Sequence, residues 1–389
     1  MLFLGDSAVF GQIMEALFAL SKTAFEIALG LTGILALWLG IMKIGEKAGF
    51  IQLLARFLSP LFARLMPEVP RDHPALGSMV MNIAANALGL DNAATPLGIK
   101  AMKELQSINP EPTSASNAQI LFLVINTSAV TLFPVTIFTY RAQMGAANPT
   151  DVFIPILIAT YCSTLCGLFS VAFVQKINLL DRVILTYFGA FSALIGLILV
   201  YFTSLEQAAM QAQSAFISNF ILFSLIITFI TAALIKKVDA YSAFIEGAKE
   251  GFQTAVTIIP FLVAMLVAIG VFRASGALDL LMDAVRRLME IMALDSRFVD
   301  ALPTALMKPL SGSGARSMMV DTMQTFGADS FAGRLASIVQ GSTETTFYVL
   351  AVYFGSVKIK HIRHALGCGL VADFGGILAS VFICYWFFG

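Results

Sequence analysis

The sequence predicts an all-α membrane protein that crosses the bilayer several times. Of its 389 residues, 58% are apolar and only 12% are charged, whereas about 25% are charged in an ordinary soluble domain. The apolar residues lie in runs close to the ~20 residues that a helix needs to span hydrocarbon, and the mean hydropathy is +0.85. Lipid is therefore the expected surrounding of most of the surface.

The charge and motif content argue against several other classes of protein. Basic and acidic residues number 24 each, so the formal net charge is zero and no basic footprint favours nucleic acid. The four cysteines lie in apolar runs, and the three histidines lie outside ligand spacings such as HExxH. Because strict HExxH and GxSxG motifs are missing, we expect neither an enzyme nor a bound metal or other cofactor.

Long apolar runs, interrupted by charged residues, Pro or Gly, predict eight spanning helices. These cover 22–43, 118–140, 152–175, 183–203, 214–235, 252–272, 331–356 and 364–388. We expect residues 1–21 to form an interfacial helix. Two further segments, 46–66 and 276–293, carry an apolar stripe on one side only. They predict helices that lie along the membrane interface.

Each of these two interfacial helices is followed by a segment that is too polar and Gly-rich to span as one helix. The segments are 75–107 and 300–326, and both predict re-entrant helical hairpins. Irregular backbone at membrane depth survives only where protein buries it or where it lines a wet cavity. Two such segments at matching positions indicate a transport site.

The order of elements occurs twice, over 22–175 and 252–388. Aligning Ser128 with Ser342 also pairs other polar and aromatic residues of the two runs. We therefore divide the chain into repeats at 1–182 and 241–389, joined by a two-span insert at 183–240. Five crossings precede the second repeat, so the two repeats are expected to be inverted. Basic loop residues predict that the first hairpin opens from the cytoplasm.

Polar residues of the first hairpin are candidates for solute binding. Asn82 and Asn86 are one helical turn apart and face the same way. Asp91 or Asn92 could cap a helix that restarts near Thr95. The alternative is that these polar groups satisfy only the backbone of the hairpin itself.

The second hairpin contains KPLSGSGARS, 308–317. If a helix starts after this turn, its N-terminus offers a partial positive charge to an anionic or carbonyl oxygen. Ser311 and Ser313 could then contact the solute, and Arg316 would add to the positive charge. The alternative is a simple tight turn in which Arg316 pairs with Asp321.

The spans that follow the hairpins carry a third group of candidates. The residues expected to bind solute there are Asn126, Ser128, Gln340, Ser342 and Thr343. Glu344 and Asp373 are ionisable residues inside predicted spans, which is by default a sign of function. Either could take a coupling proton or help to hold Na⁺. The alternative is a structural ion pair with Arg316 or Lys308.

Four motifs resemble known families. NALGLDNAATPLGIKAM (86–102) and NTSAVTLFP (126–134) resemble spore maturation protein A, whereas SGSGARS (311–317) and GSTETTFYVLAVYFGSVKIKHIRHAL (341–366) resemble spore maturation protein B. The chain looks like a fusion of both families over nearly its whole length. Both belong to the nucleoside-recognition or Gate group, with the gates of concentrative nucleoside transporters and of ferrous iron transporters. The resemblance implies inverted repeats whose hairpins meet near mid-membrane, a homo-oligomer and a place in a bacterial inner membrane.

Together these observations predict a carrier for a small polar solute that works by secondary active transport and alternating access. Two alternatives stay open. One is a gate for a metal ion such as ferrous iron, which Cys162 and Cys166, four residues apart on one helix face, would suit. The other is a membrane scaffold for envelope or spore maturation that transports nothing.

Overall fold

The computed structural model describes residues 8–128 and 131–389, apart from the side chains of residues 8, 9 and 91–93. Within these ranges the chain is helical and holds one isolated β-bridge, between Ser114 and His361. Six of the described helices are long and apolar enough to cross a membrane: α1 (Ala8–Lys47), α7 (Phe153–Gln175), α8 (Arg182–Thr203), α9 (Gln207–Ile235), α10 (Ala240–Ala274) and α16 (Ala365–Phe388). The predicted all-α, multi-pass membrane protein is confirmed.

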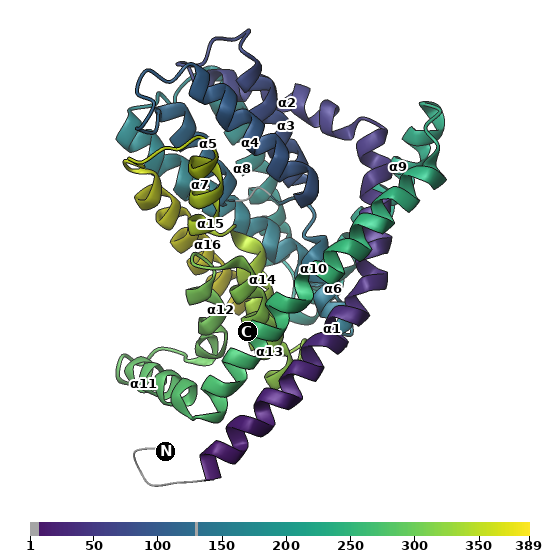
Figure 1. Cartoon of the computed structure of the whole chain (residues 1–389), viewed down its shortest axis with the longest axis vertical. Helices are drawn as coiled ribbons and strands as arrows, with labels where there is room; N and C mark the ends of the chain where they lie inside the picture. The colour runs from purple at the N-terminus through teal and green to yellow at the C-terminus, as the bar shows by residue number, and fades with distance from the viewer. Residues whose placement is uncertain (1–7, 129–130) are drawn as a thin grey trace.

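Helix α1 corrects one prediction. Residues 8–21 do not form a separate interfacial helix but continue into the first span, so that α1 is 40 residues long. At about 1.5 Å per residue it is about 60 Å long, roughly twice the thickness of the hydrocarbon. Figure 1 shows it running obliquely along one side of the molecule beside α10.

Two of the predicted spans, 118–140 and 331–356, are not continuous helices. The first divides into α5 (Asn117–Ser128) and α6 (Val135–Gln143), and the second into α14 (Phe331–Ser342) and α15 (Thr346–Ser356). We call residues 131–134 the first break and residues 343–345 the second break. Pro134 has no N–H to continue a helix. The apolar residues on both sides of each break make the two runs look long enough to span when read from sequence alone.

Both segments predicted as hairpins fold as pairs of helices joined by a turn. The first consists of α3 (Pro74–Ala87) and α4 (Asp91–Ser107), and its turn contains Gly89 with φ of 70°. The second consists of a 3-10 turn, η2 (Arg297–Ala301), with α12 (Leu302–Met307) and α13 (Gly312–Phe326). Helix α4 starts at Asp91, four residues before Thr95, near which the helix was expected to restart. The predicted amphipathic helices are α2 (Phe50–Leu65) and α11 (Ala277–Ile291).

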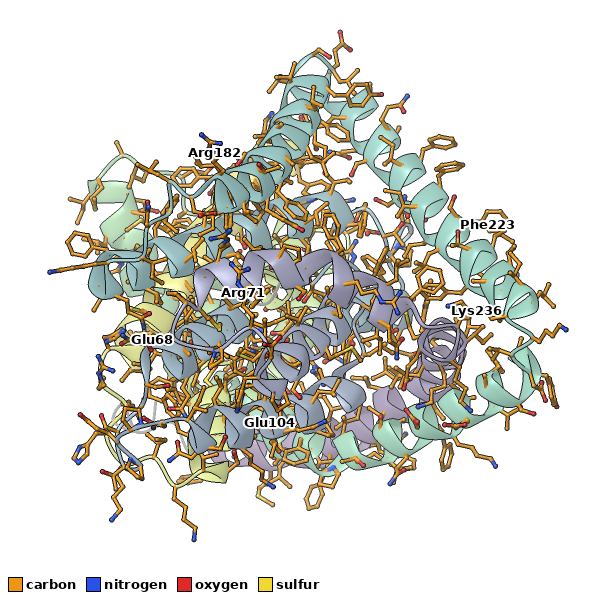
Figure 2. All side chains as sticks on the ribbon, turned by 90° about the horizontal axis from the view of Figure 1, so that it is seen from above. Glu68, Arg71, Glu104, Arg182, Phe223 and Lys236 are labelled. Carbon is orange, nitrogen blue, oxygen red and sulfur yellow. The ribbon has the colours of Figure 1, made fainter. Side chains whose placement is uncertain are left out.

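The two hairpins lie toward opposite ends of the molecule (Figure 1). Helices α2, α3 and α4 form one end, and α11 and α12 lie at the other. At the centre α7 packs against α16, and α5 and α14 pack against both. Figure 2 looks onto the end that holds the first hairpin, where Arg71, Arg182 and Lys236 are labelled. Phe223 of α9 lies at the periphery in the same view and is 63% exposed, as expected of a side chain that faces lipid.

An arginine contact of the same kind occurs at both ends of the central bundle. Arg141, near the end of α6, donates from Nη1 to the carbonyl oxygen of Ala328, 2.7 Å away, just before α14. Arg363, after α15, donates from Nη1 to the carbonyl oxygen of Ala115, 2.9 Å away, just before α5. Each half of the chain therefore satisfies a backbone acceptor at the start of the other half's broken helix.

Glycines allow α1 and α10 to approach closely. Gly247 and Gly251 of α10 form a GxxxG pair of the kind that brings membrane helices together. A Cβ atom at Gly251 would lie 2.7 Å from the Cα atom of Ala36, and one at Gly247 would lie 2.2 Å from the carbonyl oxygen of Leu39. The contact is made by backbone, which cannot move aside as a flexible side chain can.

We therefore expect Gly251→Val to push α1 and α10 apart and to destabilise the protein by about 1–3 kcal/mol. Gly189→Val is the matched control, because a Cβ atom at Gly189 of α8 meets no atom within 4 Å. Thermal unfolding of the purified variants in detergent measures both effects. Equal Tm values for the two variants would contradict the close packing of α1 on α10.

Candidate functional site

The tip of each hairpin is hydrogen-bonded to a break in a central helix. The backbone N–H of Leu132 in the first break donates to the carbonyl oxygen of Ala87 at 2.9 Å. The N–H of Phe347, just after the second break, donates to the carbonyl oxygen of Pro309 at 3.1 Å. Between the two halves, the N–H of Glu344 donates to the carbonyl oxygen of Thr127 at 2.7 Å. Backbone groups freed where helices end are thus paired across the centre.

These tips and breaks surround one polar cavity of about 80 Å³, which we call the central cavity. It is lined by the first hairpin tip, both breaks, α6, the second hairpin and the end of α14. The described lining residues that carry polar side chains are Thr131, Thr136, Tyr140, Lys308, Arg316, Gln340, Thr343 and Glu344. Gly89 and Gly312 contribute from the two tips.

The structure brings four of the predicted site residues to the central cavity: Arg316, Gln340, Thr343 and Glu344. Gln340 is 8% exposed, and among the described residues its Oε1 has no hydrogen-bond partner, so this oxygen is available to a solute. Arg316 lies over the ring of Tyr140, 5.8 Å from its centroid. Asp321, the partner of Arg316 in the alternative prediction, binds Arg273 at 2.5 Å.

Two lining residues were not predicted as part of the site. Lys308 is only 2% exposed, and it was considered from sequence only as an ion-pair partner. The sequence did contain a sign of its role, because a single lysine inside a Gly-rich hairpin of a membrane protein is costly to bury without a function. Tyr140 gave no such signal, since an aromatic residue near the end of an apolar run is ordinary.

Other predicted residues lie outside the described lining of the central cavity. Ser311 caps α13 by accepting from the N–H of Gly314 at 3.0 Å, and its hydroxyl lies 3.3 Å from that of Ser313. Ser128 and Ser342 bind carbonyl oxygens of their own helices. Thr95 is half-buried on α4. The side chains of Asp91 and Asn92 lie outside the described residues.

The three predicted asparagines form a polar cluster with Tyr353 of α15. Asn82 donates to the carbonyl oxygen of Ala94 at 2.7 Å and to the Tyr353 hydroxyl at 3.2 Å. Asn86 donates to Oδ1 of Asn126 at 2.8 Å, and the Tyr353 hydroxyl donates to the same oxygen at 3.3 Å. This asparagine–tyrosine cluster ties the first hairpin to α5 and to a helix of the other half.

The two predicted acidic residues differ in their surroundings. Glu344 is exposed and lines the central cavity. Asp373 of α16 is 1% exposed, and its Oδ2 accepts a hydrogen bond of 2.5 Å from the hydroxyl of Thr346. Glu344 therefore faces the central cavity, whereas Asp373 is enclosed by protein.

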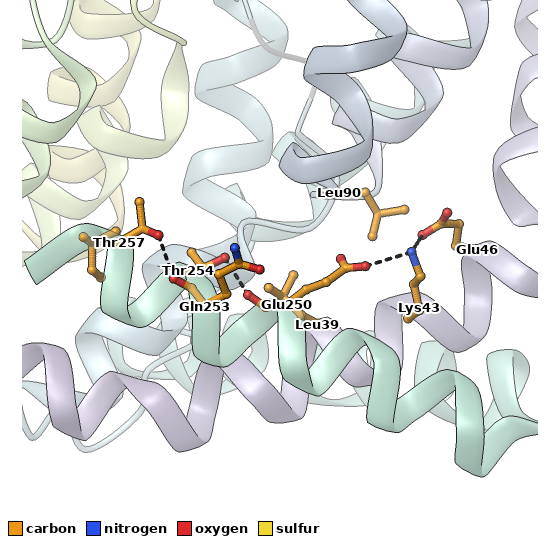
Figure 3. A pocket seen from close by; sticks show the side chains of 9 residues that line it. Leu39, Lys43, Glu46, Leu90, Glu250, Gln253, Thr254 and Thr257 are labelled. Carbon is orange, nitrogen blue, oxygen red and sulfur yellow. Dashed lines mark hydrogen bonds and ion pairs between the residues drawn. The ribbon is translucent and has the colours of Figure 1, made fainter.

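A second, larger cavity of about 540 Å³ lies between α1, α10 and the first hairpin tip, and we call it the vestibule (Figure 3). Lys43 of α1 contacts Glu250 of α10 at 3.0 Å and Glu46 at 3.1 Å. Gln253, Thr254 and Thr257 continue the polar lining along α10, on the side of Glu250 that lies away from Lys43. Leu90 lines the vestibule, and its neighbour Gly89 lines the central cavity.

A family model described as nucleoside recognition, Gate, matches residues 28–147 and 255–360, more than half of the chain. The chain is thus a multi-pass membrane protein that belongs to the Gate family. Two Bacillus subtilis (strain 168) relatives are similar to it. Spore maturation protein B is 51% identical over 155 residues, 40% of this chain and 85% of that protein. Spore maturation protein A is 42% identical over 152 residues, 39% of this chain and 78% of that protein. No solved structure matches.

We expect Tyr353→Phe to lower the free energy of unfolding by about 1 kcal/mol, because it removes hydrogen bonds to two buried asparagines that keep their other partners. Tyr348→Phe is the control, since Tyr348 is 58% exposed and lies five residues away on the same helix. Denaturant unfolding in detergent compares the two. Identical losses would show that the hydroxyl of Tyr353 contributes nothing specific.

Proposed function

We propose that the chain is a membrane transporter that carries a small polar solute by alternating access, and that the central cavity is its solute site in a closed state. One observation carries this proposal. Both hairpin tips and both broken helices, contributed by the two halves of the chain, line a single polar cavity. Irregular backbone at membrane depth is tolerated where it lines such a cavity.

The size of the cavity supports a closed state. Small-molecule sites usually measure about 300–1,000 Å³, whereas the central cavity measures about 80 Å³. This volume holds a few water molecules or a small ion. A solute of nucleoside size, the class that the family description names, requires the tips to move away from the breaks.

The charges of the lining favour a solute with an anionic or carbonyl oxygen. Lys308 and Arg316 line one side of the cavity. The 15-residue helix α13 begins at the second tip, where its N-terminal N–H groups carry a partial positive charge. Glu344 supplies an acceptor for hydroxyl or amino groups of the same solute. A polar molecule with both kinds of group fits this lining best.

The first hairpin tip is the proposed gate toward the vestibule. Gly89 and Leu90 are adjacent residues, and one lines the central cavity while the other lines the vestibule. A small movement of this turn therefore connects the two spaces. At about 540 Å³, the vestibule is wide enough for a metabolite and its hydration shell.

The organisation of the chain supports two repeats of opposite orientation, in a bacterial cytoplasmic membrane. The family model matches twice, and Arg141 and Arg363 make equivalent contacts in the opposite half. Because strict nucleotide-binding motifs are missing from the sequence, we propose secondary transport and no catalysis. The exposed apolar faces of α2 and α11 leave room for a homo-oligomer.

The rival functions have weaker support. An iron gate would need Cys162 and Cys166 beside the path of the ion. Cys166 instead packs against α16, where a Cβ atom added at Gly375 would lie 2.5 Å from the Sγ atom of Cys166. Neither cysteine belongs to the described lining of the central cavity. A scaffold role is compatible with relatives named for spore maturation. Only measured transport separates the scaffold from the carrier.

Reconstitution into liposomes tests transport directly. We expect at least one compound from a mixture of nucleosides, amino acids and small carboxylates to accumulate above the level of empty liposomes, as measured by mass spectrometry. Gln340→Leu and Glu344→Gln should each lower the flux about tenfold or more, because each removes a polar contact to solute. Lys100→Ala, an exposed change on α4, should leave flux unchanged. No accumulation of any compound, or full flux in both cavity variants, would remove the proposed site.

Thiol labelling tests the vestibule. In a background with all four cysteines replaced by serine, we expect Gln253→Cys to react with a membrane-impermeant thiol reagent added from the cytoplasmic side only, because a thiolate forms in wet surroundings. Phe223→Cys, at a lipid-facing position, is the control and should react slowly from either side. Equal labelling of Gln253→Cys from both sides would refute a vestibule closed at the first hairpin tip.

A further inference from the structure

Three buried oxygen atoms near the centre of the molecule lack hydrogen-bond partners among the described residues. They are Oδ1 of Asp373 and the hydroxyl oxygens of Thr127 and Thr343. Each of the three residues is at most 1% exposed. Leaving a buried polar atom unpaired costs about 1–3 kcal/mol, and more for a charged group. Three such atoms on neighbouring segments indicate a partner that protein atoms do not supply.

Thr127 and Thr343 lie beside the face of α16 that carries Asp373. A Cβ atom at Gly369, one turn before Asp373, would lie 3.7 Å from Cγ2 of Thr127. A Cβ atom at Gly376, one turn after Asp373, would lie 2.5 Å from Cγ2 of Thr343. The glycines thus let α5 and the second break approach the helix on both sides of the carboxylate.

The carboxylate itself is held in place. Its Oδ2 accepts from the hydroxyl of Thr346 at 2.5 Å, and Oδ1 has no partner among the described residues. The Thr343 hydroxyl lies close enough to interact with this carboxylate, but it makes no hydrogen bond of regular geometry with any described atom. A cation between the two groups would satisfy both oxygens.

We propose that Asp373, Thr127 and Thr343 bind Na⁺. One carboxylate with neutral hydroxyls gives a hard oxygen site of charge −1, which suits a monovalent cation. Ca²⁺ is usually held by several carboxylates, and among the described residues no group of three His, Cys, Asp or Glu side chains lies close enough to hold a metal ion.

The site links the two broken helices to the central cavity. Thr127 belongs to the first half and Thr343 to the second, so a bound ion joins them. The next residue, Glu344, donates its N–H to the Thr127 carbonyl oxygen and lines the central cavity. Occupation by Na⁺ therefore fixes the backbone that presents Glu344 to solute. This coupling role rests on the proposed transport function, whereas Na⁺ binding itself does not.

The test measures Na⁺ binding to the purified full-length chain in detergent, without any solute. Thermal unfolding is followed in NaCl, KCl and choline chloride at equal ionic strength, together with equilibrium binding of ²²Na⁺. We expect a saturable rise in Tm with NaCl alone and saturable ²²Na⁺ binding. Asp373→Asn should abolish both, and Thr343→Val should weaken binding about tenfold or more. Thr343→Ser, which keeps the hydroxyl, should retain binding.

Ser380→Ala is the matched control, because Ser380 is a buried hydroxyl on the same helix that bonds the carbonyl oxygen of Gly376 at 2.7 Å. It should leave Na⁺ binding unchanged. Equal effects of the three salts, or a stability that follows pH and not Na⁺, would overturn the site. If Asp373→Asn fails to fold, Thr127→Val and Thr343→Val test the site in its place. Full ²²Na⁺ binding in both variants would overturn the proposed Na⁺ site. Na⁺ binding without any transport would refute the proposed function alone.

Discussion

The structure depends on pairing the backbone groups that are left free where helices end near the centre of the molecule. Lipid offers no hydrogen bonds, so every free N–H and C=O in a membrane protein of this kind needs a protein partner or water. Here three backbone bonds meet this need: Leu132 to Ala87, Phe347 to Pro309 and Glu344 to Thr127. Two connect hairpin tips to breaks, and the third connects the halves. Each irregular segment therefore satisfies a backbone group of another.

This constraint explains where polarity is found in so apolar a chain. Polar side chains gather beside the breaks, where backbone irregularity already requires protein or water. The asparagine–tyrosine cluster fixes the first hairpin against α5 and α15. Lys308, Arg316 and Glu344 surround the small cavity that remains between the tips. The same requirement therefore positions both the support of the hairpins and the groups that can meet a solute.

The sequence was sufficient for the class of fold, the hairpins and the amphipathic helices, because apolar runs and Gly-rich interruptions follow directly from the thickness of the membrane. It was insufficient for the breaks. Residues 343–345, Thr-Glu-Thr, lie within a largely apolar run, and only tertiary contacts decide whether such a run continues as a helix. Of the candidate site, Arg316, Gln340, Thr343 and Glu344 line the cavity. Lys308 and Tyr140 were missed, since nothing local to them shows which distant segments they face.

The matching arginine contacts have a consequence for assembly. Arg141 reaches Ala328, and Arg363 reaches Ala115, so neither contact needs the peptide that connects the halves. Two separate polypeptides with these sequences could dock through the same bonds. The insert of α8 and α9 would then serve mainly to guarantee equal numbers of both parts and to hold them together as soon as they are synthesised. A backbone cut between these two helices would leave the docking surfaces intact.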